Sequence, residues 1–242
     1  MCCRCLGMAV YKTKTMSERS LKPDFFEFFI ELSTHNQKGW FDENRARYER
    51  DVKKPFEDLV GELLKAFAGQ QKAEVTVRPG DCIFRINRDI RFSKDKTPYK
   101  LNRSAIISPV GKKSLGPDGF YFEAGPEQCA FYAGFYMPNK EQLMQIRRHI
   151  AKNPNTWYEI TRESTFKSTF GDVLGEKQKR IPAELTAQKN LPAAVYNTQF
   201  YIQHLMEPEV FIEQDPVVVL MNLWNKAQKL TKFLSEATHV QD

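Results

Sequence analysis

The hydrophobic period of the sequence changes twice, and this order limits the fold more than any other feature. Apolar residues recur at helical spacing over 42–67, alternate with a period of two between 75 and 137, and return to helical spacing from Leu143 onward. A block of strands between two blocks of helices differs from the βαβ alternation of a dinucleotide-binding fold. We therefore expect an α+β protein with a central, mainly antiparallel sheet from the middle of the chain, packed by N-terminal and C-terminal helices.

The first helices are delimited by residues with strong local preferences. Asp24 is a candidate N-cap with Glu27 three positions later, which predicts a capping box before a phenylalanine-rich segment. Residues 35–39 break this helix. A longer helix is predicted from about Asp42 to Phe67, kinked or restarted at Pro55 because proline lacks the N–H donor of the helical ladder.

The middle of the chain has the alternation of short strands separated by turn residues. The predicted strands lie around 75–77, 82–86, 101–107, 120–124 and 131–137. The last two flank Gly125-Pro126-Glu127, a composition typical of tight turns. These two strands are therefore predicted to form an antiparallel hairpin.

The C-terminal block is helical again. An apolar stripe from Leu143 to Ile150 predicts a helix that Asn153-Pro154 ends, and a further helix is expected over 166–175. The last helix has the clearest start, because Asp215 is a candidate N-cap and Pro216 occupies the first helical position.

The chain is expected to form one domain with a short extension. Residues 1–15 have no hydrophobic period, so we interpret them as an irregular extension. Met16-Ser17-Glu18 is typical of a translation start, and a start codon assigned too early would explain the extension. Residues 16–242 contain no internal repeat, which favours a single α+β domain. A chain of this length buries about 70–75% of the surface that it exposes when unfolded, which is enough for a stable core without disulfides or metal ions.

Cysteine usage and hydropathy indicate a cytoplasmic protein without membrane contact. Three of the five cysteines are Cys2, Cys3 and Cys5, and only Cys82 and Cys129 lie in the body, which is not a disulfide framework. Cys2 and Cys5 are half of a zinc motif, and the four histidines are scattered, so no metal site is predicted. No run of about 18 apolar residues and no signal-peptide stretch occurs.

The positive charge of the chain is concentrated between residues 85 and 103. The net charge of the chain is +6, and this segment contributes +5 through seven cationic side chains against Asp89 and Asp95. The cations are Arg85, Arg88, Arg91, Lys94, Lys96, Lys100 and Arg103. Charge confined to one segment favours a discrete anion site over a broad surface that coats nucleic acid.

The same segment carries the pattern Arg-x-x-Arg-Asp-x-Arg-Phe-x-x-x-Lys-x-x-Tyr from Arg85 to Tyr99. It resembles a bacterial conserved-hypothetical family known as domain of unknown function 2461. The block Asn36–Tyr48, which contains Trp40-Phe41, and the segment Gly119–Arg147 are similar to the same family, so the resemblance covers about residues 24–235. It implies no established activity, and the chemistry has to come from the residues themselves.

These residues predict an anion site. Arginine holds phosphate or carboxylate bidentately, and like charges this close together repel one another, so stability alone does not account for them. The predicted anion-binding residues are Arg85, Arg88, Arg91, Lys94, Lys96, Tyr99, Lys100 and Arg103. Asp89 and Asp95 are the catalytic candidates, as an acid or base or as holders of a cation. Arg85 lies between two apolar residues and is expected to be at least half buried and paired with Asp89, Asp95 or Glu123.

Two functions are compatible with this segment. The first is a module that binds or processes a phosphate-bearing ligand, nucleic acid being one candidate, with Phe92 and Tyr99 available to stack on a base. The second is a non-catalytic protein that docks an acidic partner protein through the same residues; a solvated basic face is the simplest interpretation of the charges. Convergence of the side chains on a concavity would favour the first, and side chains splayed from a convex loop the second. No cofactor is indicated, and whether the chain is an enzyme stays open.

Overall fold

The computed structural model describes residues 20–71, 76–114, 116–186 and 190–239. Residues 1–15, with Cys2, Cys3 and Cys5, therefore lie outside the described part. The elements are α1 (Pro23–Thr34), α2 (Lys38–Glu43), α3 (Arg45–Arg47), a π-helix (Tyr48–Lys53), α4 (Lys54–Gln71), α5 (Pro79–Cys82), β1 (Arg103–Ile107), a 3-10 turn (Gly111–Lys113), β2 (Phe120–Ala124), β3 (Cys129–Phe135), α6 (Lys140–Lys152), α7 (Pro154–Thr161), α8 (Ser164–Phe170), α9 (Ala183–Thr186), a second 3-10 turn (Ala193–Tyr196), β4 (Phe200–Met206), α10 (Glu209–Glu213) and α11 (Pro216–His239).

The four strands form one antiparallel sheet in the order β1-β2-β3-β4, which confirms the α+β class and the central sheet. The predicted hairpin is present, with Ala124 opposite Cys129 across its turn. The edge strand β4 comes from a stretch for which no strand was predicted, although buried Phe200 and Ile202 alternate there with half-buried neighbours. The sheet joins segments that are far apart in the sequence.

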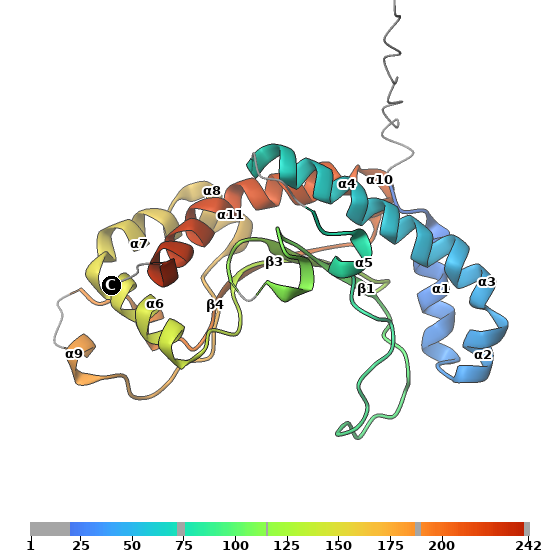
Figure 1. Ribbon diagram of the computed structural model, residues 1–242, viewed down its shortest axis with the longest axis horizontal. Helices are drawn as coiled ribbons and strands as arrows, with labels where there is room; N and C mark the ends of the chain where they lie inside the picture. Colours follow the sequence, from blue (N-terminus) through green and yellow to red (C-terminus); the bar gives the residue numbers. More distant parts are fainter. Residues whose placement is uncertain (1–19, 72–75, 115, 187–189, 240–242) are drawn as a thin grey trace, which may run out of the picture.

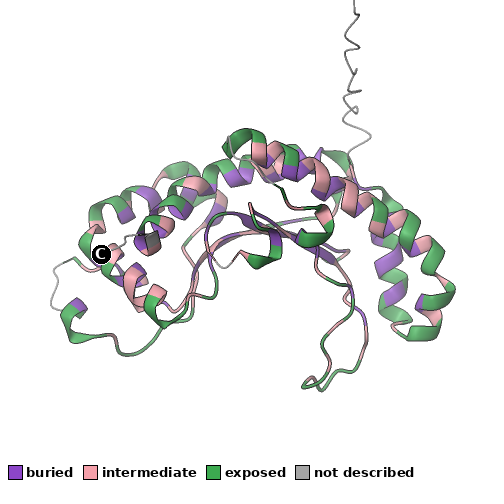
Figure 2. Ribbon diagram, viewed as in Figure 1, coloured by how far each residue is buried: buried purple, intermediate pink, exposed green. Residues whose placement is uncertain are grey.

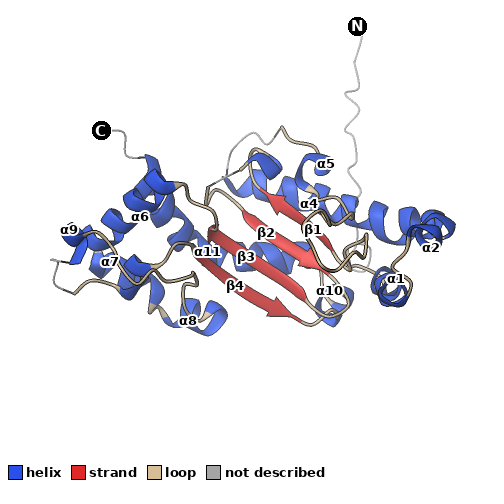
Figure 3. Cartoon of the chain, turned by 90° about the horizontal axis from the view of Figure 1, so that it is seen from below, coloured by secondary structure: helices blue, strands red, loops and turns tan. Residues whose placement is uncertain are grey.

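Helices α4 and α11 cover one face of the sheet (Figures 1 and 3). The core lies between these layers, as the buried residues in Figure 2 show. The ring of Phe56 on α4 stacks on Phe122 of β2 at 5.4 Å, and Trp224 of α11 lies 5.8 Å from Phe120. Each fully buried phenylalanine stabilises the fold by about 1.5–3 kcal/mol, so this layer anchors the sheet.

The N-terminal helices follow the predicted breaks but not the predicted cap. Helix α1 begins at Pro23 with Lys22 as its N-cap residue, and Asp24 lies in the first turn instead of capping it. The capping box at Asp24 is therefore wrong, because Pro23 already has the φ angle that starts a helix. Pro55 is the second residue of α4, directly after the π-helix, which confirms the restart there.

The C-terminal helices agree closely with the sequence. Helix α6 ends before Asn153-Pro154, and the Val217 N–H donates to Asp215 Oδ1 at 2.9 Å, which confirms the N-cap of α11. Helix α8 is shorter than expected, because it ends at Phe170, before Gly171 in a left-handed conformation with φ of 71°. None of the described helices is both long enough and apolar enough to cross a membrane.

The strands predicted before β1 are wrong where they can be compared. Pro79 starts the short helix α5, in which the Arg78 N–H donates to Asp81 at 3.1 Å, and Val75 lies outside the described residues. Ile83 contacts β1 only through an isolated bridge to Ala105. Beyond Ile83 the chain leaves the sheet, so alternation in this stretch did not signal a strand.

Candidate functional site

Residues 84–102, here called the basic arm, leave the sheet at Ile83 and return at β1. The arm projects from the body on the side of the sheet opposite α4 and α11 (Figure 1). At its root the two limbs pair: the Arg88 N–H donates to Pro98 O and the Lys100 N–H donates to Ile86 O, each at 2.8 Å. The arm is therefore an extended excursion held together by its own backbone.

Tyr99 fixes the arm to the N-terminal helices. Its side chain is buried and its ring stacks on Phe41 with centroids 4.2 Å apart. The Asn36 side chain donates to Tyr99 O at 2.9 Å and accepts from the Tyr99 N–H at 3.1 Å. Tyr99 thus has a structural role, and its ring is already covered by Phe41, which argues against stacking on a base; its role in binding an anion stays a prediction.

Two arginines of the arm pair with the two catalytic candidates. Arg88 contacts Asp95 and Thr97, and Arg91 makes bidentate hydrogen bonds to Asp89 at 2.7 and 2.9 Å. Hydrogen bonds from the Thr97 N–H and then from Arg88 lower the pKa of Asp95 to about 2, and Arg91 lowers the pKa of Asp89. Carboxylates so acidic are weak general bases at neutral pH, which favours a structural role.

Arg85 is exposed and bonds neither acid of the arm nor Glu123 among the described residues, so its predicted burial and pairing are wrong. The stretch around it bridges other strands only at Ile83 and Asn87, and its side chain therefore reaches water.

The buried arginine is Arg103 instead, on the covered face of β1 with 6% of its surface exposed. Its guanidinium donates to Phe84 O at 3.0 Å and lies 5.6 Å from the Phe56 ring centroid. Burial lowers the pKa of Arg103. Arg103 is therefore enclosed on the helical side of the sheet, away from the open face, and its role as an anion ligand stays a prediction that this burial argues against.

Four predicted anion-binding residues remain without an ion pair in the described part of the chain: Arg85, Lys94, Lys96 and Lys100. Lys96 also donates to Ile90 O at 2.9 Å. Lys100 is half-buried at the root of the arm, with its Nζ 5.6 Å from the Phe84 ring centroid. Burial, and then the charges of Arg103 and Arg85, lower the pKa of Lys100. These cations are spread along the arm and do not converge on a pocket within it.

A groove of about 650 Å³ lies beside the arm on the open face of the sheet. Its floor is a tyrosine row, defined as Tyr121, Tyr132, Tyr201 and Tyr136. Centroid distances along the row are 5.7 Å from Tyr121 to Tyr132, 6.4 Å to Tyr201 and 5.3 Å onward to Tyr136. Phe84, 6.0 Å from Tyr121, continues the row to the root of the arm. Aromatic faces therefore cross three strands of the sheet.

Glu123 is the acidic residue of the groove. Tyr121 Oη donates to its Oε2 at 2.9 Å and Asn102 Nδ2 donates to the same oxygen at 3.2 Å. Burial raises the pKa of Tyr121 above its ordinary value, so the phenol keeps its proton as a donor. The carboxylate is held in one orientation by two donors on one oxygen.

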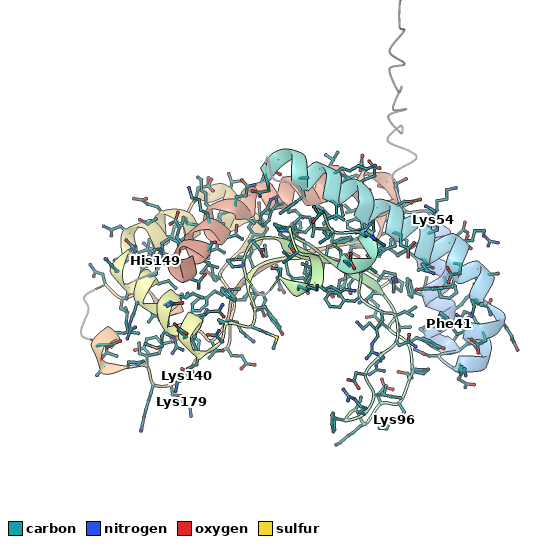
Figure 4. The ribbon with its side chains drawn as sticks, in the orientation of Figure 1. Phe41, Lys54, Lys96, Lys140, His149 and Lys179 are labelled. Carbon is teal, nitrogen blue, oxygen red and sulfur yellow. The ribbon has the colours of Figure 1, made fainter. Side chains whose placement is uncertain are left out.

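Further cations lie across the groove from the arm. They are Lys140 at the start of α6 and Lys179 in the connection between α8 and α9, where Lys177 and Arg180 are its neighbours in sequence; all four are exposed and without an ion pair among the described residues. Figure 4 places Lys140 and Lys179 at one end of the concave side and Lys96 at the other. Positive charge therefore frames the tyrosine row at both ends.

Comparison with protein families matches residues 24–233 to a model described as "Conserved hypothetical protein (DUF2461)". The chain belongs to this family. The match confirms the resemblance inferred from the sequence, and the basic arm, the tyrosine row and Glu123 all lie within the matched residues. No curated protein and no solved structure matches the chain.

For this DUF2461 protein, the sequence located the basic arm but missed the groove. Alternation placed Tyr132 and Tyr136 on the outer face of a strand, and no function was assigned to them. One outward tyrosine on each of several neighbouring strands is the signal that could have identified the row, yet Tyr201 lies on β4, which was not predicted.

Proposed function

We propose that the chain binds single-stranded nucleic acid across the open face of its sheet. In this arrangement the bases lie on the tyrosine row, and the phosphates contact the cations of the basic arm and of the α6 end. The observation that carries the proposal is the partly exposed tyrosine row that lines the groove, with exposed cations on both sides of it that make no ion pair among the described residues. Whether a reaction follows binding is left open by this proposal.

The aromatic floor supports a ligand with flat rings. Tyr136 is 59% exposed and Met137 beside it is 77% exposed, so the far end of the row is open to a partner. Every base has a π-face, and stacking on an aromatic side chain contributes about 1–3 kcal/mol per base. An unpaired strand can present its bases to such a floor, whereas a duplex keeps them stacked inside.

The charge distribution supports a ligand with spaced phosphates. Lys94 and Lys96 on the arm, and Lys177 and Lys179 at the other end, are exposed and make no ion pair in the described residues. Each phosphate neutralised on a single strand contributes about −0.7 to the slope of log affinity against log salt concentration. A strand that reaches both ends of the groove should therefore bind with marked salt dependence.

The test is fluorescence anisotropy with a labelled single-stranded 15-mer of mixed sequence at several salt concentrations. Tyr132→Leu should weaken binding by about 5- to 100-fold, the loss of one stacked base. Tyr158→Leu is the matched control, because Tyr158 lies on α7 outside the groove and packs on Arg162. Lys94→Ala should lower the salt slope by about 0.7, and Lys229→Ala on α11 should not. Equal effects of Tyr132→Leu and Tyr158→Leu, or no saturable binding at low salt, would refute the proposal.

Docking of an acidic partner protein is the second candidate, supported by Phe92. This side chain is 95% exposed in the arm, with the Arg91 guanidinium 5.8 Å from its ring centroid. An exposed aromatic beside cations is typical of an interface anchor. Under this alternative Phe92→Ala abolishes binding of the partner, and Tyr132→Leu leaves it unchanged.

A further inference from the structure

Glu123 lies where a base on the tyrosine row would present its edge. On the open face of the sheet Glu123 is opposite Ser104 on one side and Ala130 on the other, whereas Tyr121 two residues earlier is opposite Tyr132. Ser104 and Ala130 are themselves buried, and Glu123 lines the groove together with the two rings. A flat ligand stacked on Tyr121 or Tyr132 therefore has its edge next to Glu123.

The two oxygens of this carboxylate are not equivalent. Both protein donors, Tyr121 Oη and Asn102 Nδ2, bond Oε2, and no described residue donates to Oε1. A carboxylate oxygen is only an acceptor, so a ligand that covers Oε1 and displaces its water has to supply a donor. The hydrogen bonds to Oε2 hold the side chain in place, which lowers the entropic cost of a hydrogen bond between Oε1 and a ligand.

We propose that Glu123 selects bases with an exocyclic amino group, so that the groove prefers cytosine to thymine. This inference rests on the proposed function. Cytosine presents an N4 amino donor where thymine presents the O4 acceptor, and acidic side chains accept from the cytosine amino group. Thymine in the same position would bring its O4 lone pairs against Oε1 and leave the carboxylate without a donor. Hydrogen bonds to a charged group are the strong ones, and the discrimination is about 10-fold or more.

Glu123→Gln should reverse the preference. The amide has one acceptor, its carbonyl oxygen, and this oxygen is needed where Tyr121 and Asn102 donate. The amide NH₂ then takes the place of Oε1 and points a donor at the ligand. A donor at this position favours the O4 of thymine and opposes the amino group of cytosine. The exchange is isosteric, and the fold should be retained.

The experiment measures dissociation constants of labelled oligo-dC and oligo-dT decamers for the wild type and for Glu123→Gln. The two decamers have the same charge and ring size, so phosphate contacts are matched, and comparison with Glu123→Gln separates the carboxylate from any difference in stacking. We expect the wild type to bind oligo-dC at least about 10-fold more tightly, and Glu123→Gln to bind oligo-dT as tightly as oligo-dC or more tightly. Circular dichroism and thermal unfolding check the fold of the variant.

The outcomes separate the two proposals. Saturable binding of both decamers with equal constants in the wild type overturns the role of Glu123 and leaves strand binding intact. A wild-type preference for oligo-dC that persists in Glu123→Gln assigns the selectivity to another residue and also overturns this inference. No saturable binding of either decamer overturns both proposals. If the variant fails to fold, the wild-type ratio alone still decides between equal and unequal binding.

Discussion

Asn36 is the residue whose removal should release the basic arm from the body. Its side-chain amide makes two hydrogen bonds to the backbone of Tyr99, one as donor to the carbonyl at 2.9 Å and one as acceptor from the N–H at 3.1 Å. It joins the break after α1 to the base of the arm, 63 residues further along the chain. Asn36→Ala leaves both groups of the Tyr99 backbone without their partner.

The loss in stability follows from these two bonds. Each contributes about 0.5–1.5 kcal/mol net, and a buried group left unpaired costs more. Asn36 is half-buried, so water partly replaces the lost partners, and the free energy of unfolding should fall by about 1–3 kcal/mol. For a domain of this size the melting temperature should fall by about 2–10 °C.

The assay combines thermal unfolding with hydrogen exchange at the Tyr99 amide. Asn36→Ala should accelerate this exchange by about 10- to 100-fold, because the N–H loses its acceptor. Asn36→Asp keeps an acceptor for the Tyr99 N–H but loses the donor to its carbonyl, and should lie between the wild type and Asn36→Ala. Gln37→Ala, at the exposed neighbour, is the control. If Asn36→Ala behaves like Gln37→Ala in both measurements, Asn36 does not hold the arm.

Two further predictions concern the charges of the segment 85–103. Arg85→Ala should change the free energy of unfolding by less than about 0.5 kcal/mol, because the side chain is exposed. Arg103→Ala should lower it by about 2–4 kcal/mol, because it leaves a cavity and an unpaired Phe84 carbonyl. Urea unfolding measures both variants, and equal losses would contradict the assignment of Arg103 as buried and Arg85 as exposed. Asp95, with its pKa lowered from 3.8 to about 2, stabilises the folded state above pH 3.8, and this contribution is lost as the pH falls through about 2. An NMR titration should therefore find the Asp95 carboxyl ionised down to pH 3. Arg88→Ala should raise the midpoint of this titration only in part, because the Thr97 N–H still donates to Asp95. A midpoint near 3.8 in the wild type would refute the pairing of Asp95 with Arg88 and Thr97.

The sequence by itself determined the elements whose ends depend on local chemistry. Asp215-Pro216 starts α11, Asn153-Pro154 separates α6 from α7, and the turn after Ala124 joins β2 to β3, each as predicted. These signals are readable because a cap, a missing N–H or a tight turn acts between residues a few positions apart. The family was identified in the same way, from side chains at short fixed spacings within one segment.

Only the tertiary structure decided which of these side chains face a ligand. Arg85 lies between Phe84 and Ile86 in the sequence and Arg103 between Asn102 and Ser104, yet Arg103 lies under α4 and Arg85 reaches water. Contacts with Asn36 and Phe41 hold Tyr99 away from the groove, and Tyr201 on β4 completes the tyrosine row. Alternation shows that a strand has two faces, but which face is covered depends on packing against helices distant in sequence, and local periodicity carries no information on that packing.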